Sequence, residues 1–559
     1  MPTITAMRWA QPRRKYNITS EGLAGQPHIM KTTELTKRYD SLIVGAGHNG
    51  LTCGAYLARA GKRVLVLERK PVIGGASVTE EFSPGFRAST YSFIMGHLHP
   101  KVITELDLQK HGLQYYQVND VVNPTENDCI VFTSDPVKNQ AQIARFSQKD
   151  AENYPKFFAQ LQSTIALLRQ LQLETPFDPF RTDLKGLWRS LRFAWRYRHS
   201  EKEFYNLLSS LSLSAHDYVD QWFETDLVKA KFMFWATIGG NVGPYSPGTA
   251  FYLVTHLVGQ TGMRFARGGM GAIADAIAAS GKTHGMEVRC NAGVEEILLR
   301  GDRACGVRLA GGEEILADTV VSNVAAKVTF GGLVPRDKLP TEFMERIDGF
   351  RTRGKSFKLL CALDRLPRYA GFSQERTGCD YPAYAHICPT PEFLERAYDD
   401  AKYGWYSSEP FLSPIVPTYY DDTLAPAGKH VITFQGGVTP YELKGANWDD
   451  QRQTLIQNVW KVMDRFAPGF SNSVTDYKLY LPKDIEQDIN MPGGHTQHGE
   501  LTLDQLFMMR PTPKYADYRS PIHKLYQCGA STHPGGAVSG VNGHNAAREI
   551  LRDERFLLL

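Results

Sequence analysis

The sequence has little cysteine, with eight residues in a chain of 559 and no C-x-x-C pair among them. A disulfide framework needs denser spacing, so we expect free thiols in a reducing compartment. The C-x-x-x-x-C pair and the second glycine fingerprint of a flavin disulfide reductase are also absent, which excludes that chemistry. The Gly-x-Ser-x-Gly sequence of the α/β-hydrolases is missing too.

The chain also lacks a large excess of either charge, because 63 Lys and Arg nearly balance 59 Asp and Glu and leave a net charge of +4. Residues 1–38 carry this excess, and the rest of the chain is close to neutral. Clustered cations are needed to hold nucleic acid, so the composition excludes that partner. Residues 1–38 are interpreted as a basic tail or as a weak organelle-import segment, since they lack the apolar core of a secretory signal.

No apolar run is long and continuous enough to span a membrane. The longest uncharged stretch, residues 232–263, is interrupted by glycines and prolines at 239–248. We expect a buried loop and strand there. Its aromatic side chains are expected in the core or along an apolar substrate slot.

A strand, a glycine turn and a helix follow one another from residue 41. Residues 41–44 are apolar, Gly45-Ala-Gly-His-Asn-Gly50 follows, and a helical stretch extends to residue 60. Gly45 permits a tight turn, Gly47 lets backbone amides approach a pyrophosphate, and Gly50 lets the helix lie close to the strand. The N-terminus of the helix would then face the phosphates. The pattern predicts dinucleotide binding.

An acidic residue ends the next apolar strand, and this residue bears on the type of dinucleotide. Glu68 follows Gly45 by 23 residues, where a carboxylate can accept hydrogen bonds from ribose hydroxyls and would repel a 2′-phosphate. Gly74 and Gly75 come soon after it. A glycine pair there would let a second backbone segment approach the pyrophosphate of an extended ligand. FAD is therefore favoured over NAD, and NADP is disfavoured.

Two further segments extend the same domain. Residues 525–528 are interpreted as a strand that leads through a glycine-rich loop into a helix over 541–551, whose N-terminus would offer partial positive charge to a flavin. A helix at 272–279 precedes strands near 287–289, 293–299 and 315–321. We therefore predict a discontinuous FAD-binding domain and a second domain for substrate. The FAD-binding domain would comprise residues 39–100, 264–330 and 501–559, and the substrate domain residues 101–263 and 331–500.

These motifs resemble those of the phytoene desaturase-like FAD oxidoreductases, within the amine-oxidase-type flavoprotein fold. The resemblance spans about residues 39–551 and includes Val72–Glu81, Phe146–Asp150, Gln221–Glu224, Leu501–Leu506 and Thr532–Gly536. It implies an α/β, two-domain flavoprotein with a Rossmann-like FAD domain and a mixed α+β substrate domain.

The resemblance also implies which residues bind FAD. They are Gly45, Gly47, Gly50, Glu68, Gly74 and Gly75, with Val294 near the adenine and with Gly529, Gly540 and Val541 near the flavin. The chain departs from the family at two arginines. His544 stands where many members have Arg, and Ala76 stands where amine oxidases have the Arg of Gly-Gly-Arg. The roles of those arginines do not carry over to this chain.

No cluster of acids, bases or nucleophiles stands out as catalytic. Such an absence fits a flavin dehydrogenation, in which the protein positions a C–H bond and excludes water. The pairs His97/His99 and His495/His498 lack carboxylates or cysteines at ligand spacing, so no metal is predicted. His533, in the glycine loop, is a candidate for contacting cofactor or substrate, or is a loop histidine bonded to backbone.

The resemblance implies an FAD-dependent oxidoreductase that transfers hydride from a hydrophobic substrate, such as an isoprenoid, a polyene or another lipid, to the flavin. Two alternatives stay open: an isomerase that uses reduced FAD, and a mitochondrial regulatory or interaction protein that keeps the FAD fold for structure. By resemblance the protein is placed in the mitochondrial matrix, with a protein partner there, whereas a prokaryotic source would make it cytoplasmic.

Residues 181–198 form a basic amphipathic pattern. One face carries Leu184, Leu187, Trp188, Leu191 and Trp195, and the basic residues are Arg181, Lys185, Arg189, Arg192, Arg196 and Arg198 against the single acid Asp183. Such a helix can lie on an anionic membrane surface. The alternative is a helix whose apolar face packs on its own domain and whose basic face is solvated.

Overall fold

The computed structural model describes residues 38–556 except 119, 177, 181–182 and 261–262. The predicted basic tail lies outside the described residues apart from Arg38, and so does Arg181 of the amphipathic pattern. No helix in the described ranges has both the length and the apolar composition that crossing a bilayer requires.

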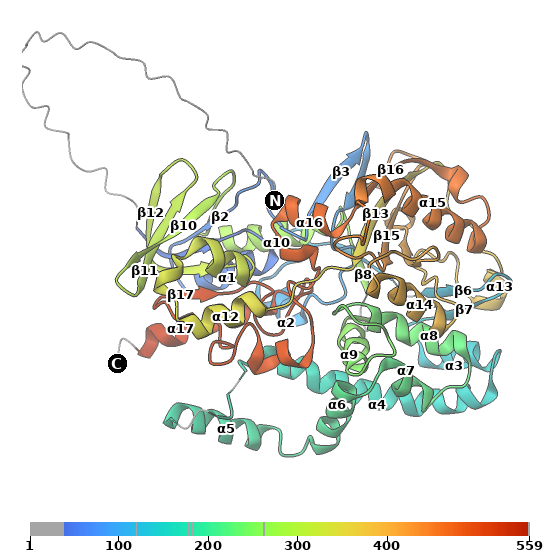
Figure 1. Cartoon of the computed structure of the whole chain (residues 1–559), viewed down its shortest axis with the longest axis horizontal. Helices are drawn as coiled ribbons and strands as arrows, with labels where there is room; N and C mark the ends of the chain where they lie inside the picture. The colour runs from blue at the N-terminus through green and yellow to red at the C-terminus, as the bar shows by residue number, and fades with distance from the viewer. Residues whose placement is uncertain (1–37, 119, 177, 181–182, 261–262, 557–559) are drawn as a thin grey trace, which may run out of the picture. The chain divides into compact units, whose positions relative to one another are not determined.

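A seven-stranded sheet gathers strands from three distant parts of the sequence (Figure 1). Its strands are β1 (Tyr39–Val44), β2 (Val64–Leu67), β9 (Glu287–Arg289), β10 (Val294–Arg300), β11 (Arg303–Leu309), β12 (Glu314–Ser322) and β17 (Leu525–Gln527). β1 lies between β2 and β12, and both pairs are parallel, as are β2–β9 and β12–β17. β10 and β11 extend the sheet as an antiparallel hairpin. The carboxyl ends of β1, β2 and β12 therefore meet at one edge.

Three helices share an apolar core with this sheet: α1 (His48–Arg59), α10 (Gly271–Lys282) and α17 (Val541–Phe556). α1 contacts both of the others. Close packing depends on small residues, since a Cβ at Gly54 would lie only 2.7 Å from the Met286 sulfur and 3.1 Å from Ile43 Cδ1. The strand–turn–helix–strand unit expected over residues 41–68 is thus present, with its helix pressed against the sheet.

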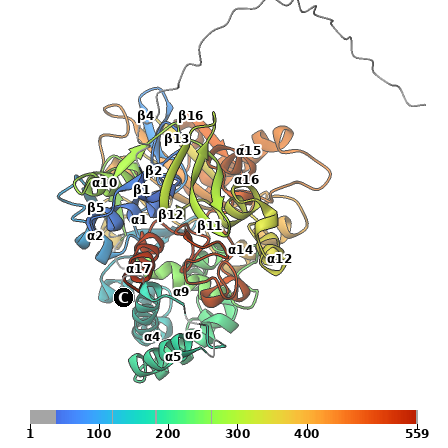
Figure 2. The ribbon, with the colours of Figure 1, turned by 90° about the vertical axis from the view of Figure 1, so that its left-hand side faces the viewer.

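A second sheet has four antiparallel strands in the order β14, β15, β13, β16. These strands are β13 (Ser356–Leu363), β14 (Phe411–Ile415), β15 (His430–Gly437) and β16 (Val474–Tyr480). Figure 2 labels two of them, β13 and β16. Helix α15 (Trp448–Phe466) packs its apolar side on this sheet through Val459 and Met463, in a core that also holds Leu359 and Phe434. This sheet carries Gln435, which reaches the second cavity described below.

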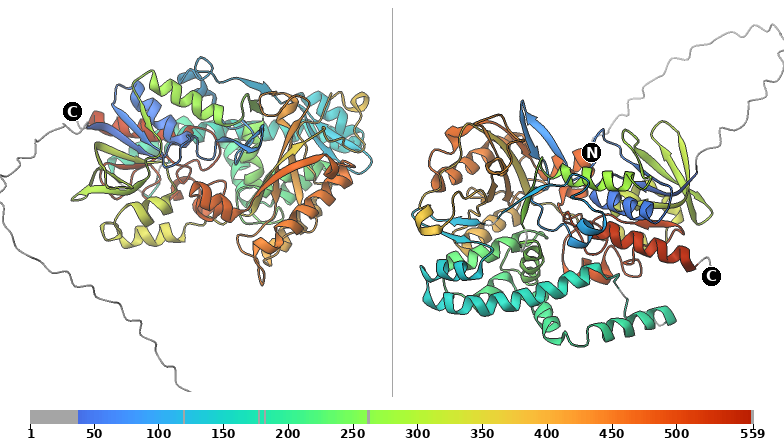
Figure 3. Two further views of the ribbon diagram at one scale, coloured as in Figure 1. Left: turned by 90° about the horizontal axis from the view of Figure 1, so that it is seen from above. Right: turned by 180° about the vertical axis from the view of Figure 1, so that it is seen from behind.

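A largely helical region completes the described structure (Figure 3). Its helices are α3 (Pro136–Ala144), α4 (Gln148–Leu173), α5 (Leu184–Arg196), α6 (Glu201–Ser212), α7 (Ala215–Asp220), α8 (Asp226–Met233) and α9 (Thr249–Gln260). The shorter elements elsewhere are α2 (Pro100–Glu105), α11 (Ala326–Val328), α12 (Thr341–Gly349), α13 (Gln374–Thr377), α14 (Pro391–Lys402), α16 (Pro482–Ile489), β3 (Thr79–Ser83), β4 (Phe86–Ser89), β5 (Tyr115–Gln117), β6 (Val121–Pro124), β7 (Cys129–Phe132) and β8 (Arg264–Ala266).

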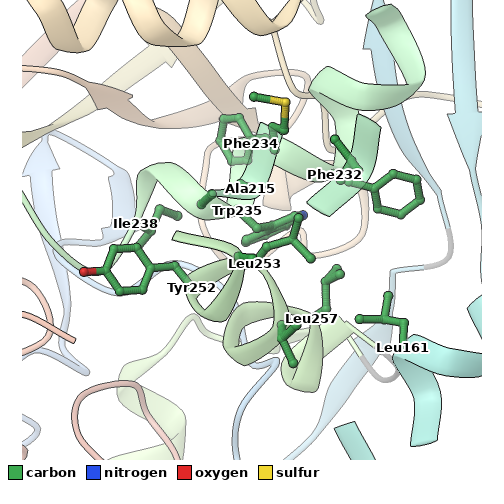
Figure 4. Close-up of a cluster of buried hydrophobic side chains, with 14 of the residues drawn as sticks. Leu161, Ala215, Phe232, Phe234, Trp235, Ile238, Tyr252, Leu253 and Leu257 are labelled. Carbon is green, nitrogen blue, oxygen red and sulfur yellow. The ribbon is translucent and has the colours of Figure 1, made fainter. Parts of the chain in front are cut away.

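Of the buried loop and strand expected over residues 232–263, the loop is present at 238–248, but the strand is replaced by helix. The segment contains the end of α8, a 3₁₀ turn at Phe234–Thr237, a glycine-rich loop and helix α9. Leu253 and Leu257 of α9 lie in one core cluster with Trp235 and Phe232, as Figure 4 shows. A helix that is surrounded by apolar neighbours has no polar face, so its sequence lacks the 3.6-residue alternation that identifies surface helices.

Candidate functional site

An open cavity lies where the seven-stranded sheet ends, with about 1140 Å³ of empty space when its open solvent-filled part is included. It is lined by residues from the carboxyl ends of three parallel strands: Gly45 after β1, Glu68 after β2, and Asn323 after β12. Ligands of open α/β sheets bind at this edge. Of the ten residues predicted to bind FAD, Gly45, Gly47, Glu68, Gly75 and Val294 line this cavity.

The N-terminus of α1 opens into this cavity. Gly47 is the N-cap residue and no side chain caps the helix, while His48 and Asn49 of the first turn line the cavity. The first amides of a helix have no partners within it, so they present hydrogen-bond donors and partial positive charge. A Cβ on Gly47 would lie 2.8 Å from Asn323 Nδ2. The backbone amides at this helix end can therefore donate to an anionic ligand, at a position where a side chain would not fit.

Glu68 is held by two backbone amides, one in the glycine turn and one after β2. Its Oε2 accepts a hydrogen bond from the Ala46 amide at 2.9 Å, and its Oε1 accepts one from the Lys70 amide at 3.0 Å. The carboxyl group is nearly buried yet lines the cavity. Each carboxylate oxygen can accept a second hydrogen bond, so the group can still receive two hydroxyls from a ligand.

The Gly74-Gly75 pair brings a second chain segment against the glycine turn. The Gly74 amide donates to the Ala46 carbonyl at 2.9 Å, and both glycines have positive φ, +118° and +58°. A Cβ on Gly75 would lie 3.2 Å from the Gly47 Cα. Gly75 faces the cavity, whereas Gly74 and Gly50 lie behind its wall and allow the backbone segments to approach each other.

The C-terminal glycine loop meets the cavities through residues other than those predicted. Ala530, Ala537 and Val538 of this loop line one or both cavities. The predicted residues Gly529, Gly540 and Val541 line neither. The reason is helix packing, because a Cβ on Gly543 in the first turn of α17 would lie 2.1 Å from the Asn49 carbonyl oxygen. The start of α17 thus lies against α1, and the preceding loop faces the cavity.

A second cavity continues from the first, with about 880 Å³ of empty space when its open solvent-filled part is included. The two share five lining residues: His48, Ala76, Met491, His498 and Ala530. Ala76 is the position at which amine oxidases have an arginine, so a methyl group stands at the junction. Trp235 and Ile238 line the second cavity, whereas the neighbouring Phe232 and Phe234 are core residues.

The lining of the second cavity has no formal charge at neutral pH. No Asp, Glu, Lys or Arg is among its described residues, and most of them are apolar, including Phe93, Ile94 and Val538. Its ionisable imidazoles belong to His48, His97, His256 and His498. Burial lowers the pKa of His48 and of His256 to about 4, and that of His97 and of His498 to about 3. All four rings are therefore neutral.

Two of these rings have a defined tautomer. His256 Nδ1 lies 2.7 Å from the Tyr252 carbonyl oxygen, and His48 Nε2 lies 3.2 Å from that of Ala537. A carbonyl oxygen only accepts, so these nitrogens carry the hydrogen, and the other nitrogen of each ring can accept. The Trp235 ring stacks on His256 with centroids 6.1 Å apart.

Several buried polar atoms beside the cavities have no hydrogen-bond partner. They include Asn49 Oδ1, His498 Nδ1 and Trp235 Nε1, each on a lining residue. Leaving such a group unpaired costs about 1–3 kcal/mol, and ligands commonly satisfy it. With the glycine turn, the uncapped helix and the held carboxylate, these atoms fit an extended dinucleotide that runs from the first cavity toward the second.

The other histidines considered in the sequence, His533 and His97, lie in different surroundings. His533 is buried, its Nε2 lies 3.0 Å from the Leu171 carbonyl oxygen, and it lines neither cavity, so it is a loop histidine bonded to backbone. His97 lines the second cavity. In the part of the chain that the structure describes, no three His, Cys, Asp or Glu side chains gather as metal ligands, and all eight cysteines are unpaired.

Sequence reasoning missed one buried cation that organises the site. Arg510 is completely buried and donates to the carbonyl oxygens of Gln497 at 3.0 Å and of Ala530 at 2.9 Å. It also donates to the Glu500 carbonyl at 3.1 Å. Burial lowers the pKa of Arg510 to about 9. The residue joins two loops that line the cavities, and no sequence motif marks it.

Comparison with known proteins identifies a matching family and several similar chains. The family model described as flavin containing amine oxidoreductase matches residues 50–551. A rat protein named pyridine nucleotide-disulfide oxidoreductase domain-containing protein 2 is 35% identical over 552 residues, which cover 93% of this chain and 94% of the relative. The lycopene-forming phytoene desaturase of Pantoea ananas is 24% identical, with 90% and 96% covered. Cyclohexylamine oxidase from Brevibacterium oxydans has the same fold, with a TM-score of 0.55, 16% identity, and 93% and 100% covered.

Proposed function

The chain belongs to the family of flavin-containing amine oxidoreductases and is an FAD-dependent oxidoreductase, and from that premise we propose that it oxidises an uncharged, hydrophobic substrate held in the second cavity. The substrate class is an isoprenoid, a polyene or another lipid. The likeness to a phytoene desaturase supports a hydrocarbon of this kind. The uncharged lining of the second cavity is the observation that carries the proposal.

The first cavity would hold the nucleotide part of FAD. Gly45, Gly47 and Gly75, with the first amides of α1, would contact the pyrophosphate, and Glu68 would accept the ribose hydroxyls. Val294 would lie near the adenine. Gly50 and Gly74 would support the turn from behind, and the loop of Gly529, Gly540 and Val541 would present its neighbours Ala530, Ala537 and Val538 near the ring system.

Bound FAD supplies the hydride acceptor, so the chain itself needs no reactive acid or base for the removal of hydrogen from carbon. The side chains of the second cavity would exclude water and orient a C–H bond toward the junction at Ala76 and Ala530. The neutral imidazoles of the lining, among them those of His48 and His256, are groups that could accept a proton there.

The uncharged lining distinguishes a hydrocarbon from an amine. A cationic ammonium group would lose its hydration in this cavity without meeting a carboxylate, which is costly. A hydrocarbon loses nothing of this kind and gains from leaving water. The cavity therefore favours the substrate class of the desaturases over that of the amine oxidases within this family.

Anaerobic single-turnover spectroscopy tests this proposal. Purified FAD-containing protein is mixed with an isoprenoid or polyene dispersed in detergent, and in parallel with primary amines. We expect loss of the oxidised flavin absorption with the hydrocarbon and not with the amines. Bleaching by amines alone would overturn the proposal. A rearranged product without lasting bleaching would assign the isomerase alternative instead.

We also propose a location in the mitochondrial matrix, because the chain is similar to mammalian relatives over most of its length. Cell fractionation with protease protection tests it, and recovery of the protein outside mitochondria would contradict it. In cells that lack the native protein, full rescue by a variant that no longer binds FAD would assign a regulatory role rather than an enzymatic one.

A further inference from the structure

Helix α5 exposes a row of large apolar side chains. The exposed fractions are 86% for Leu184, 53% for Leu187, 70% for Trp188, 56% for Leu191 and 70% for Trp195. Their spacing of three, four, seven and eleven residues places them on one face of the helix. They are five of the fifteen exposed large apolar side chains among the described residues. Isolated exposed apolar residues need no explanation, but a contiguous row marks a contact surface.

Arginines on another side of α5 form ion pairs with acidic residues of the rest of the protein. Arg189 lies 3.8 Å from an Asp517 oxygen and 3.5 Å from an oxygen of Glu549, a completely buried residue of α17. Arg196 forms an ion pair with Glu174, which follows α4. The helix also packs on its own domain, because Phe193 lies against the apolar core. The five side chains of the apolar row are not part of that contact and remain exposed.

Cations also border the apolar face. Arg192 follows Leu191 on the helix surface and is exposed. It lines a hollow whose other charged residues are Arg189, Arg196, Arg552 and Glu174. At the C-terminal end of α5, the Arg198 guanidinium lies 4.6 Å from the centre of the Trp195 ring. An interfacial helix places apolar side chains, often with Trp, in the acyl boundary and cations beside lipid phosphates. The composition and the geometry of α5 match this arrangement.

We propose that α5 is an interfacial helix that docks the protein on a bilayer containing anionic lipids. Leu187, Trp188 and Leu191 would enter the acyl boundary, and Arg192 would meet lipid headgroups. A second copy of the chain fits less well, because a symmetric contact through α5 would bring the cations of both copies together. A membrane supplies the opposite charge and the apolar layer at once.

Flotation with lipid vesicles tests the proposal with the full-length, FAD-containing protein. Vesicles of phosphatidylcholine alone are compared with vesicles in which about a third of the lipid is phosphatidylglycerol, an amount on the order of that in anionic membranes. We expect binding to the anionic vesicles, with at least about tenfold weaker binding to the neutral ones. The double variant Trp188→Ser with Leu191→Ser should lose binding. The control Tyr403→Ser with Leu503→Ser, which removes two side chains that are 73% and 61% exposed elsewhere, should bind like the wild type.

A charge variant separates lipid docking from self-association of the chain. Arg192→Glu should weaken binding to anionic vesicles and reduce its dependence on salt, because a counterion-sensitive contact is removed. Unchanged flavin absorption and melting temperature show that each variant is folded. Failure of the wild type to bind, or equal binding by the Trp188/Leu191 variant, would overturn the proposal. A wild-type dimer that this variant dissociates, without vesicle binding, would assign the face to a second copy.

Discussion

The backbone amide of Ala46 donates a hydrogen bond of 2.9 Å to Glu68 Oε2, which joins the glycine turn after β1 to the acid that ends β2. The Ala46 carbonyl accepts from the Gly74 amide at 2.9 Å. Through these two bonds Ala46 holds together the glycine turn, the segment of Glu68 and the segment of Gly74-Gly75, and each of these lines the first cavity. The side chain of Glu68 accepts two backbone hydrogen bonds and also lines the first cavity.

Replacing Glu68 should weaken FAD binding. Glu68→Ala removes the carboxylate that would accept from the ribose, and one hydrogen bond to a charged group contributes about 1.5–3 kcal/mol. We therefore expect FAD affinity to fall by about ten- to a hundredfold, measured by titrating deflavinated protein with FAD and following flavin fluorescence. Glu345→Ala, at an exposed position on α12, is the matched control. Equal FAD affinity in both variants would show that the carboxylate does not contact the ribose.

A side chain at Gly47 should obstruct the cofactor. The Cβ of Gly47→Val would lie 2.8 Å from Asn323 Nδ2 at the cavity wall, and its methyl groups would occupy the space beside the uncapped helix end. We expect purified protein with little or no bound FAD, measured as the ratio of flavin to protein absorption. Gly349→Val, where a Cβ meets no atom within 4 Å, is the control and should retain FAD. Full FAD occupancy in Gly47→Val would contradict the assigned role.

The glycine turn and Glu68 could be predicted from the sequence because their roles are local. A turn, a helix start and the acid after the next strand lie within about 30 residues, and each has a steric or hydrogen-bonding requirement that restricts its residue type. Val294 came from the family resemblance rather than from its own pattern. The structure places it on the wall of the same cavity.

The rest of the site depends on contacts between distant segments. Asn323 reaches the glycine turn only because β12 pairs with β1, and Met491 and His498 come from irregular loops that no residue pattern identifies. Gly540 was predicted to approach the flavin, yet its missing side chain makes room for Thr52 and Val102. A glycine indicates that two groups are close, and the sequence does not say which two.

Removing the Arg510 guanidinium should destabilise the loops around the junction of the cavities. Arg510→Met leaves the carbonyl oxygens of Gln497, Glu500 and Ala530 without this donor in a dry environment. With about 1–3 kcal/mol for each unpaired group, we expect a loss of about 3 kcal/mol or more in the free energy of unfolding, measured by urea denaturation. Arg300→Met, at an exposed strand end, should change stability by less than about 0.5 kcal/mol. Similar losses in both variants would contradict the role of Arg510.

Acidification should destabilise the protein through the cavity histidines. The pKa of His256 is lowered by burial to about 4 from an ordinary value of 6.5, so between these values the unfolded chain binds more protons than the folded one. Stability therefore falls as the pH drops from about 6.5 toward 4, by up to about 1.4 kcal/mol per pH unit for each such histidine. Unfolding of wild type and His256→Gln, measured from about pH 7.5 to about pH 4.5, should give a smaller slope for the variant. Parallel slopes would indicate that His256 is not neutral in the folded state.

A charge placed in the second cavity should slow oxidation of the hydrophobic substrate without displacing FAD. Ile238 lines the second cavity but not the first. A carboxylate in Ile238→Asp would meet no Lys or Arg in the lining of this cavity, and a long apolar molecule would have to desolvate it. Lys355, which lines a separate small hollow with Ile238, donates to the Val242 carbonyl at 2.8 Å instead. We expect normal flavin absorption and at least about tenfold slower anaerobic flavin reduction at limiting substrate, since about 1.4 kcal/mol already gives that factor. Ile238→Val keeps the apolar surface and should react at nearly the wild-type rate. Unimpaired reduction in Ile238→Asp would place the substrate elsewhere, and loss of FAD would mean that the two cavities are not functionally separate.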